Sequence, residues 1–151
     1  MTCSKIMIGI VCVLVLGTSN AAPAAKPEEA IKYRRGVMAA QGWNFRAMGD
    51  VIKGDLPYDK AEFAQRAANL AALSKLALEG FLVEGAEKGE TKAKPEMFGD
   101  LDKVREGMAR LSSETNKLAQ VAATGELGAI KAQFNEVSKL CKGCHDNYRV
   151  R

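Results

Sequence analysis

The stretch from residue 127 to residue 148, LGAIKAQFNEVSKLCKGCHDNY, spaces its apolar and sulfur-bearing side chains three and four residues apart. That alternation is typical of one face of an α-helix. The face consists of Leu127, Ile130, Phe134, Val137, Cys141, Cys144 and Tyr148. Because the two cysteines continue the apolar stripe, we expect whatever they hold to lie in the protein core, near one end, rather than on a surface loop.

The same stretch contains the pattern C-x-x-C-H, formed by Cys141, Cys144 and His145. This spacing is the attachment motif of haem c, in which two thiols bond covalently to the vinyl groups and the adjacent imidazole ligates iron. On a helix, residues 141 and 144 share a face, and residue 145 lies one turn from residue 141. We therefore predict one covalent haem c per chain with His145 as metal ligand. His145 is the only histidine of the chain, which excludes a second histidine ligand from the same chain.

Residues 1–25 have the pattern of a secretory signal peptide. A single basic residue, Lys5, precedes an apolar run at residues 6–16, and small residues follow. The run is too short to form a transmembrane helix. We expect cleavage after Ala21 or Ala25, which leaves residues 26–151 as one domain in the periplasm with no membrane attachment.

Cys3 and Cys12 leave with this signal, and the bulky Val11 argues against a lipid-modified Cys12. The only cysteines that remain are the two of the motif. A structural zinc site needs four ligands, and the motif supplies three with no further cysteine or histidine. A redox C-x-x-C motif belongs to a βαβ context, and the sequence shows no alternating strand pattern. A zinc site and a redox dithiol are therefore both less favoured than haem attachment.

Three more segments show helical spacing, separated by glycine and proline. The first covers residues 27–52, the second begins at the predicted cap Asp59 and extends to Phe81, and the third covers residues 101–122 and stops at Gly125. The seam of the first is Ile31, Arg34, Met38, Gln41, Phe45, Met48 and Ile52. Residues 85–95 are expected to form a loop.

Short connections join the first helix to the second and the third to the fourth, which favours antiparallel neighbours. We therefore predict an all-α, up-down-up-down four-helix bundle with haem c buried in its core. The chain has 22 Lys and Arg against 18 Asp and Glu, a net charge of +4, and the two signs are interleaved. Nucleic acid is not indicated as a partner.

A terminal C-x-x-C-H on the last helix of such a bundle, behind a signal peptide, resembles the class II cytochromes c and most closely cytochrome c′. The resemblance covers the mature chain. It is carried by residues 26–34, 53–59, 89–91, 94–98 and 141–149. It implies a homodimer joined through the first two helices, binding of NO and CO, and a role in NO handling or in electron transfer with a redox partner.

The resemblance also implies roles for three further residues. Met38 covers the distal side of the haem without binding iron, Arg34 contacts a haem propionate, and Arg149 lies beside the proximal imidazole. Each has a plainer alternative: Met38 as core filler, Arg34 reaching out to the end of the bundle, and Arg149 as a cation at a helix C-terminus. A third reading of Met38 is as sixth ligand, which makes a low-spin electron carrier with a raised potential. The loop before the third helix is similar to that of the high-spin proteins, which favours the reading in which Met38 covers the distal side of the haem without binding iron.

Without a distal histidine, peroxidase-type acid–base chemistry lacks its usual proton carrier. We therefore expect a periplasmic gas-binding haem protein rather than an enzyme, with an electron-transfer cytochrome as the alternative and a haem sensor as a weaker third. Phe81 and Leu82 are candidates for further walls of the distal pocket. Trp43 fits an interface or the core equally well.

Overall fold

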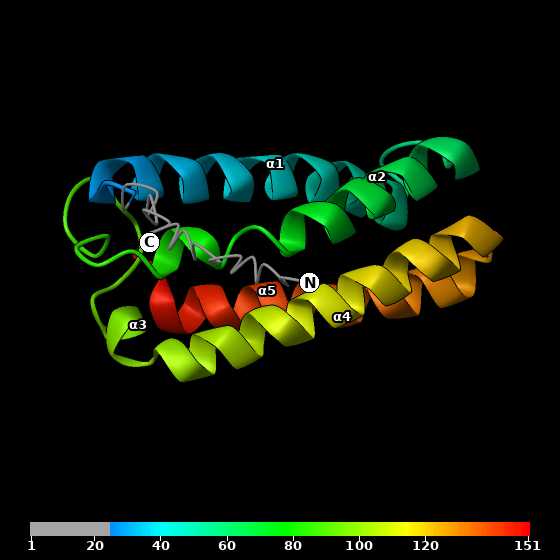
Figure 1. Ribbon diagram of the computed structural model, residues 1–151. Helices are drawn as coiled ribbons and strands as arrows, with labels where there is room; N and C mark the ends of the chain where they lie inside the picture. Colours follow the sequence, from blue (N-terminus) through cyan, green and yellow to red (C-terminus); the bar gives the residue numbers. More distant parts are fainter. Residues whose placement is uncertain (1–24) are drawn as a thin grey trace, which may run out of the picture.

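The computed structural model describes residues 25–151, so the predicted signal peptide lies almost entirely outside the described residues. The elements are α1 (Pro27–Lys53), α2 (Lys60–Ser74), η1 (Glu79–Phe81), α3 (Glu96–Gly99), α4 (Leu101–Thr124) and α5 (Leu127–Tyr148). Four long helices lie alongside one another, and each runs opposite to the one before it (Figure 1). The predicted all-α, up-down-up-down bundle is confirmed. Within residues 25–151, no helix combines the length and apolar character needed to cross a membrane.

Local sequence determines where the long helices begin and end. The carboxylate of Asp59 accepts a hydrogen bond from the backbone N–H of Glu62 at 2.7 Å, as expected of an N-cap. Gly54 and Gly125 follow α1 and α4 with φ of 89° and 85°, the left-handed conformation that glycine adopts without steric cost. These boundaries match the predicted ones.

The prediction that the second helix extends to Phe81 is wrong. α2 ends at Ser74, and the chain continues in tighter turns with i to i−3 hydrogen bonds up to the 3-10 turn η1. Ala77 and Phe81 are nevertheless buried, with 0% and 6% of their surface exposed. The apolar spacing therefore identified the buried residues correctly and the backbone conformation incorrectly.

The tighter winding brings η1 directly against α1. A Cβ atom on Gly80 would lie 2.7 Å from Cβ of Arg34 and 2.8 Å from the carbonyl oxygen of Ala30. Only glycine fits such a close approach of two backbones. This contact is made by residues 46 and 50 positions apart in the chain, so no local pattern predicts it.

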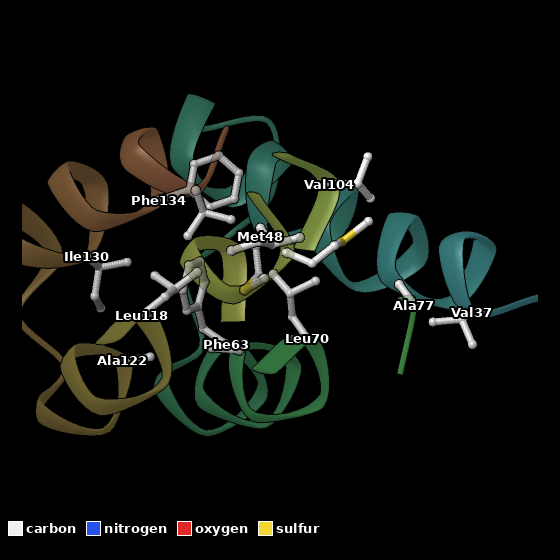
Figure 2. Close-up of a cluster of buried hydrophobic side chains, with 14 of the residues drawn as sticks. Val37, Met48, Phe63, Leu70, Ala77, Val104, Leu118, Ala122, Ile130 and Phe134 are labelled. Atoms are coloured by element: carbon white, nitrogen blue, oxygen red, sulfur yellow. The ribbon is translucent and has the colours of Figure 1, made fainter. Parts of the chain in front are cut away.

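One apolar core joins all four long helices. Figure 2 shows Met48 of α1, Phe63 of α2 and Leu118 of α4 converging at its centre. Among these, Met48 and Leu118 have no exposed surface. The same cluster continues to Val37 and Ala77. It contains buried residues from each of the four long helices.

The helices do not pack equally closely on all sides. α1 packs along α2 and η1, α2 packs along α4, and α4 packs along α5, but the backbones of α1 and α5 hardly approach each other. α1 and α5 meet where Phe45 stacks on Phe134, with ring centroids 4.4 Å apart and the planes 8° from parallel. The start of α1 and the end of α5 lie at the opposite end of the bundle from the α1–α2 turn (Figure 1).

Candidate haem-binding site

The Phe45–Phe134 stack fixes the register between α1 and α5. Since the two helices are antiparallel, seven residues back along α1 and seven residues on along α5 reach the same level, two turns away and on the same faces. Those positions are Met38 and Cys141. Both are half-buried and border the apolar core. The fold therefore places the predicted distal residue across from the predicted attachment site, where the two backbones stay apart.

The thiols of Cys141 and Cys144 are unpaired and half-buried on this face of α5. Burial, and to a lesser extent the neighbouring Cys144, raises the pKa of the Cys141 thiol to about 11. Burial also raises the pKa of Cys144. Redox-active C-x-x-C motifs have lowered thiol pKa values at helix N-termini, whereas this pair lies in the last turns of a helix. The pair is therefore poorly suited to dithiol exchange and well placed for thioether bonds to an apolar group.

The residues between 25 and 151 include no cluster of three or more His, Cys, Asp or Glu side chains arranged around one point. The side chains of the C-x-x-C-H motif thus do not converge as they do on a zinc ion. The helix instead puts the two thiols on one face, with the imidazole one turn from Cys141. Covalent attachment to two vinyl groups and ligation of iron by the adjacent imidazole require this order of residues.

His145 lies in the last turn of α5 with an exposed side chain. Desolvation of part of the ring lowers the pKa of His145, the nearby Arg149 guanidinium lowers it further, and Asp146 opposes both. A lowered pKa keeps the imidazole neutral, which is the form that binds a metal. Arg149 is held close because its backbone N–H donates to the carbonyl oxygen of His145 at 3.1 Å. The structure thus places Arg149 one turn after His145, and its role beside the proximal imidazole stays a prediction.

Arg34 is the most completely enclosed charge of the site, with 2% of its surface exposed. Its guanidinium donates to the carbonyl oxygens of Gly80 at 2.9 Å and Ala86 at 2.6 Å, and to Oγ1 of Thr91 at 2.8 Å. It also lies 5.0 Å from the ring centre of Phe81 and 5.4 Å from that of Phe98. Burial lowers its pKa, and the Glu87 carboxylate opposes this.

These protein partners of Arg34 were not predicted. An arginine on an apolar seam signals that a partner must exist, but the acceptors come from loop residues 80–91 and have no sequence signal. Three of the five N–H groups of the guanidinium have protein acceptors. Since only 2% of Arg34 is exposed, the protein already encloses the rest of the guanidinium, and the propionate contact stays a prediction.

The other candidate residues differ clearly in their burial. Phe81 is buried against Arg34, whereas Leu82 leaves 38% of its surface exposed. Trp43, which the sequence left undecided between core and interface, is 69% exposed on α1. It is not a core residue of the single chain.

The loop before α4 also touches the end of α5, which sequence reasoning missed. Ala93 and Arg149 form an isolated antiparallel bridge. The backbone N–H of Lys94 donates to the carbonyl oxygen of Tyr148, and the N–H of Val150 donates to that of Lys92, both at 2.8 Å. These bonds place the loop within a turn of His145.

Comparison with known proteins identifies relatives of this chain. A family model described as Cytochrome C′ matches residues 29–149. The chain is 40% identical over 131 residues to the cytochrome c′ of Halomonas halodenitrificans, an alignment that covers 83% of this chain and 99% of the relative.

Solved structures agree. Cytochrome c prime from Shewanella frigidimarina superposes with a TM-score of 0.80 at 37% identity, covering 83% of this chain and 98% of that one. A nitrosyl complex of a variant of cytochrome c prime from Alcaligenes xylosoxidans superposes with a TM-score of 0.77 at 34% identity, covering 85% and 99%.

Proposed function

Because the chain belongs to the cytochrome c′ family, whose members carry covalent haem c, we propose that it is a periplasmic gas-binding protein. In this proposal Cys141 and Cys144 attach the haem, His145 is the only protein ligand to its iron, and NO or CO binds behind Met38. The observation that carries the proposal is the pairing of Met38 with Cys141 at one level of α1 and α5. A nitrosyl complex has been solved for the relative from Alcaligenes xylosoxidans, which supports NO as a ligand class.

Haem iron held by one imidazole supplies an open axial position that small diatomic molecules can occupy. The residues of this chain determine what reaches that position. Met38 brings an apolar, flexible side chain with no hydrogen-bond donor, so it offers nothing to stabilise bound O₂ and does not hinder NO or CO by polarity. Since His145 is the only histidine, the distal side also lacks a proton carrier, and we propose a binding protein rather than an enzyme.

The electron-transfer alternative rests on the same Met38. Met38 lies on the same face of α1 as Phe45, which stacks on Phe134 of α5, and a methionine in that position is chemically able to ligate iron. A ferric and ferrous absorption spectrum of the purified holoprotein separates the two functions. A high-spin or mixed-spin spectrum that changes on addition of NO or CO supports the gas-binding protein. A low-spin spectrum with a methionine-to-iron charge-transfer band supports the electron carrier and its redox partner.

Covalent attachment is tested by extraction. The wild type, expressed in a periplasm with a haem-maturation system, should keep its haem through acid–acetone treatment, because two thioether bonds survive acid. The double variant Cys141→Ala/Cys144→Ala should release its haem or fail to take it up. Met38→Ala is the matched control and should retain haem as the wild type does. Free haem extracted from the wild type would refute the attachment.

We also propose a homodimer through α1 and α2. The support from this structure is Trp43, because an indole that is 69% exposed on a long helix is typical of an interface anchor. Two-fold dimers bury the same patch on both subunits, so one substitution acts twice.

The dimer makes a measurable prediction. Trp43→Glu should convert the holoprotein to a monomer in sedimentation velocity at micromolar concentration, because it places a charge within the proposed interface. Leu127→Glu changes a 40% exposed apolar residue of α5 and should leave the dimer intact. A wild type that sediments as a monomer at high micromolar concentration contradicts the proposal.

A further inference from the structure

Residues 80–100 begin within η1, include α3 and end just before α4, and we refer to them as the strap. The strap crosses the end of the bundle where α1 begins and α5 ends (Figure 1). It therefore lies between the helix that carries Met38 and the helix end that carries His145. Direct backbone contact between α1 and α5 is almost lacking, so the strap is a physical connection between the two sides of the proposed haem site at this end.

On the α1 side, the buried attachment of the strap is Arg34. Its guanidinium donates to Gly80 at the start of the strap, to Ala86 in its first third and to Thr91 near its middle. The hydrogen bond from Arg35 to the carbonyl oxygen of Glu90, at 3.3 Å, is exposed. Buried, charge-assisted hydrogen bonds hold position far better than exposed ones. Arg34 lies one turn before Met38 on α1.

On the α5 side, the strap is attached through its backbone. Lys94 N–H donates to the carbonyl oxygen of Tyr148, and Val150 N–H donates to the carbonyl oxygen of Lys92. The Lys94 ammonium adds a bond of 3.0 Å to the carbonyl oxygen of Asn147. All of these partners, in the last turn of α5 or just beyond it, lie within five residues of His145.

Thr91 is the one side chain of the strap that joins the two attachments. Its hydroxyl oxygen accepts from Arg34 at 2.8 Å and from the backbone N–H of Ala93 at 3.1 Å. Ala93 is itself the residue that bridges to Arg149. A single hydroxyl thus connects the α1 guanidinium to the backbone that pairs with the end of α5.

We propose that Thr91 is a positioning residue that fixes the separation of α1 from the end of α5, and so controls both access past Met38 and the seating of His145. The proposal rests on the proposed placement of haem between these helices. Its physical basis is that a hydroxyl with two donors holds the strap at a defined length, whereas an apolar side chain of the same shape holds neither donor. Loss of one attachment should therefore change both ligand access past Met38 and the position of His145.

The test compares Thr91→Val, which keeps the shape and removes the hydroxyl, with Thr91→Ser, which keeps the hydroxyl. In the holoprotein, Thr91→Val should speed CO association by about 2- to 30-fold, the range produced by loss of a coupling contact of this kind. It should also shift the iron–histidine stretching frequency of the ferrous protein in resonance Raman spectra. Thr91→Ser should restore both values toward those of the wild type.

Thr115→Val is the matched control. Thr115 is a fully buried threonine of α4 whose hydroxyl lies 2.9 Å from that of Ser74, away from the strap. Its loss should lower the melting temperature without changing either haem measurement. If Thr91→Val folds poorly, removal of Val150 and Arg151 deletes the Val150 attachment instead and should change both measurements in the same direction.

The proposal is overturned if Thr91→Val behaves like Thr115→Val, with lower stability and unchanged CO association and iron–histidine frequency. It is also overturned if Thr91→Ser fails to restore them. A low-spin wild type would be a separate result, since it would refute the five-coordinate site itself. In that case the effect of Thr91 on the methionine charge-transfer band would still test the strap.

Discussion

Replacing Met38 with alanine should speed CO binding to the holoprotein by about tenfold or more, equivalent to lowering the barrier by about 1.4 kcal/mol. The physical reason is steric. Met38 is half-buried and lies level with Cys141 along the bundle. In the proposed site its thioether would have to move aside before a ligand reaches iron. The resting spin state should hardly change, because a wall that does not coordinate iron leaves the ligand field unaltered. Stopped-flow or flash photolysis measures the rate, and the ferric absorption spectrum reports the spin state.

Met38→Leu is the control that separates bulk from coordination. Leucine keeps most of the volume and lacks sulfur, so it should leave both the rate and the high-spin spectrum close to those of the wild type. If Met38 is instead a ligand, the wild type is low-spin, and both substitutions convert it to high-spin and lower its potential. That conversion would assign the chain to electron transfer.

Sequence reasoning was most successful where local chemistry decides the structure. The start of α1 follows from a proline in its first turn, and the ends of α1 and α4 follow from glycines that adopt positive φ, and these boundaries were predicted closely. The attachment motif and its position on the apolar face of α5 were also predicted from the sequence. These features depend on residues that lie near one another in the chain.

Reasoning from sequence failed where the backbone of one segment packs against, or accepts hydrogen bonds from, a segment far away in the chain. The end of α2 at Ser74 was missed because the apolar spacing continues to Phe81, although the tighter turns are needed to bring Gly80 against α1. For the same reason Arg34 was recognised as needing a partner, yet its carbonyl acceptors were not found. A carbonyl oxygen has no sequence signal, since every residue carries one.

The largest stability change is expected at Arg34. Arg34→Ala should lower the free energy of unfolding of the holoprotein by about 3–5 kcal/mol. The substitution deprives Gly80, Ala86 and Thr91 of their donor in a buried setting, and it empties the space between the rings of Phe81 and Phe98. Denaturant unfolding followed by far-UV circular dichroism measures the change, and covalent haem stays with the chain throughout.

The neighbouring Arg35 provides the control. Its guanidinium is 3.7 Å from the carboxylate of Glu90, with 61% and 96% of the two side chains exposed, and such surface pairs contribute about 0–1 kcal/mol. Arg35→Ala should therefore be nearly neutral. Arg34→Lys should lie between wild type and alanine, because an ammonium keeps the charge but lacks the planar fork that reaches three acceptors at once. If Arg34→Ala and Arg35→Ala cost the same, the buried guanidinium does not hold the strap to α1, and the strap must be fastened by its apolar contacts and its bonds to α5.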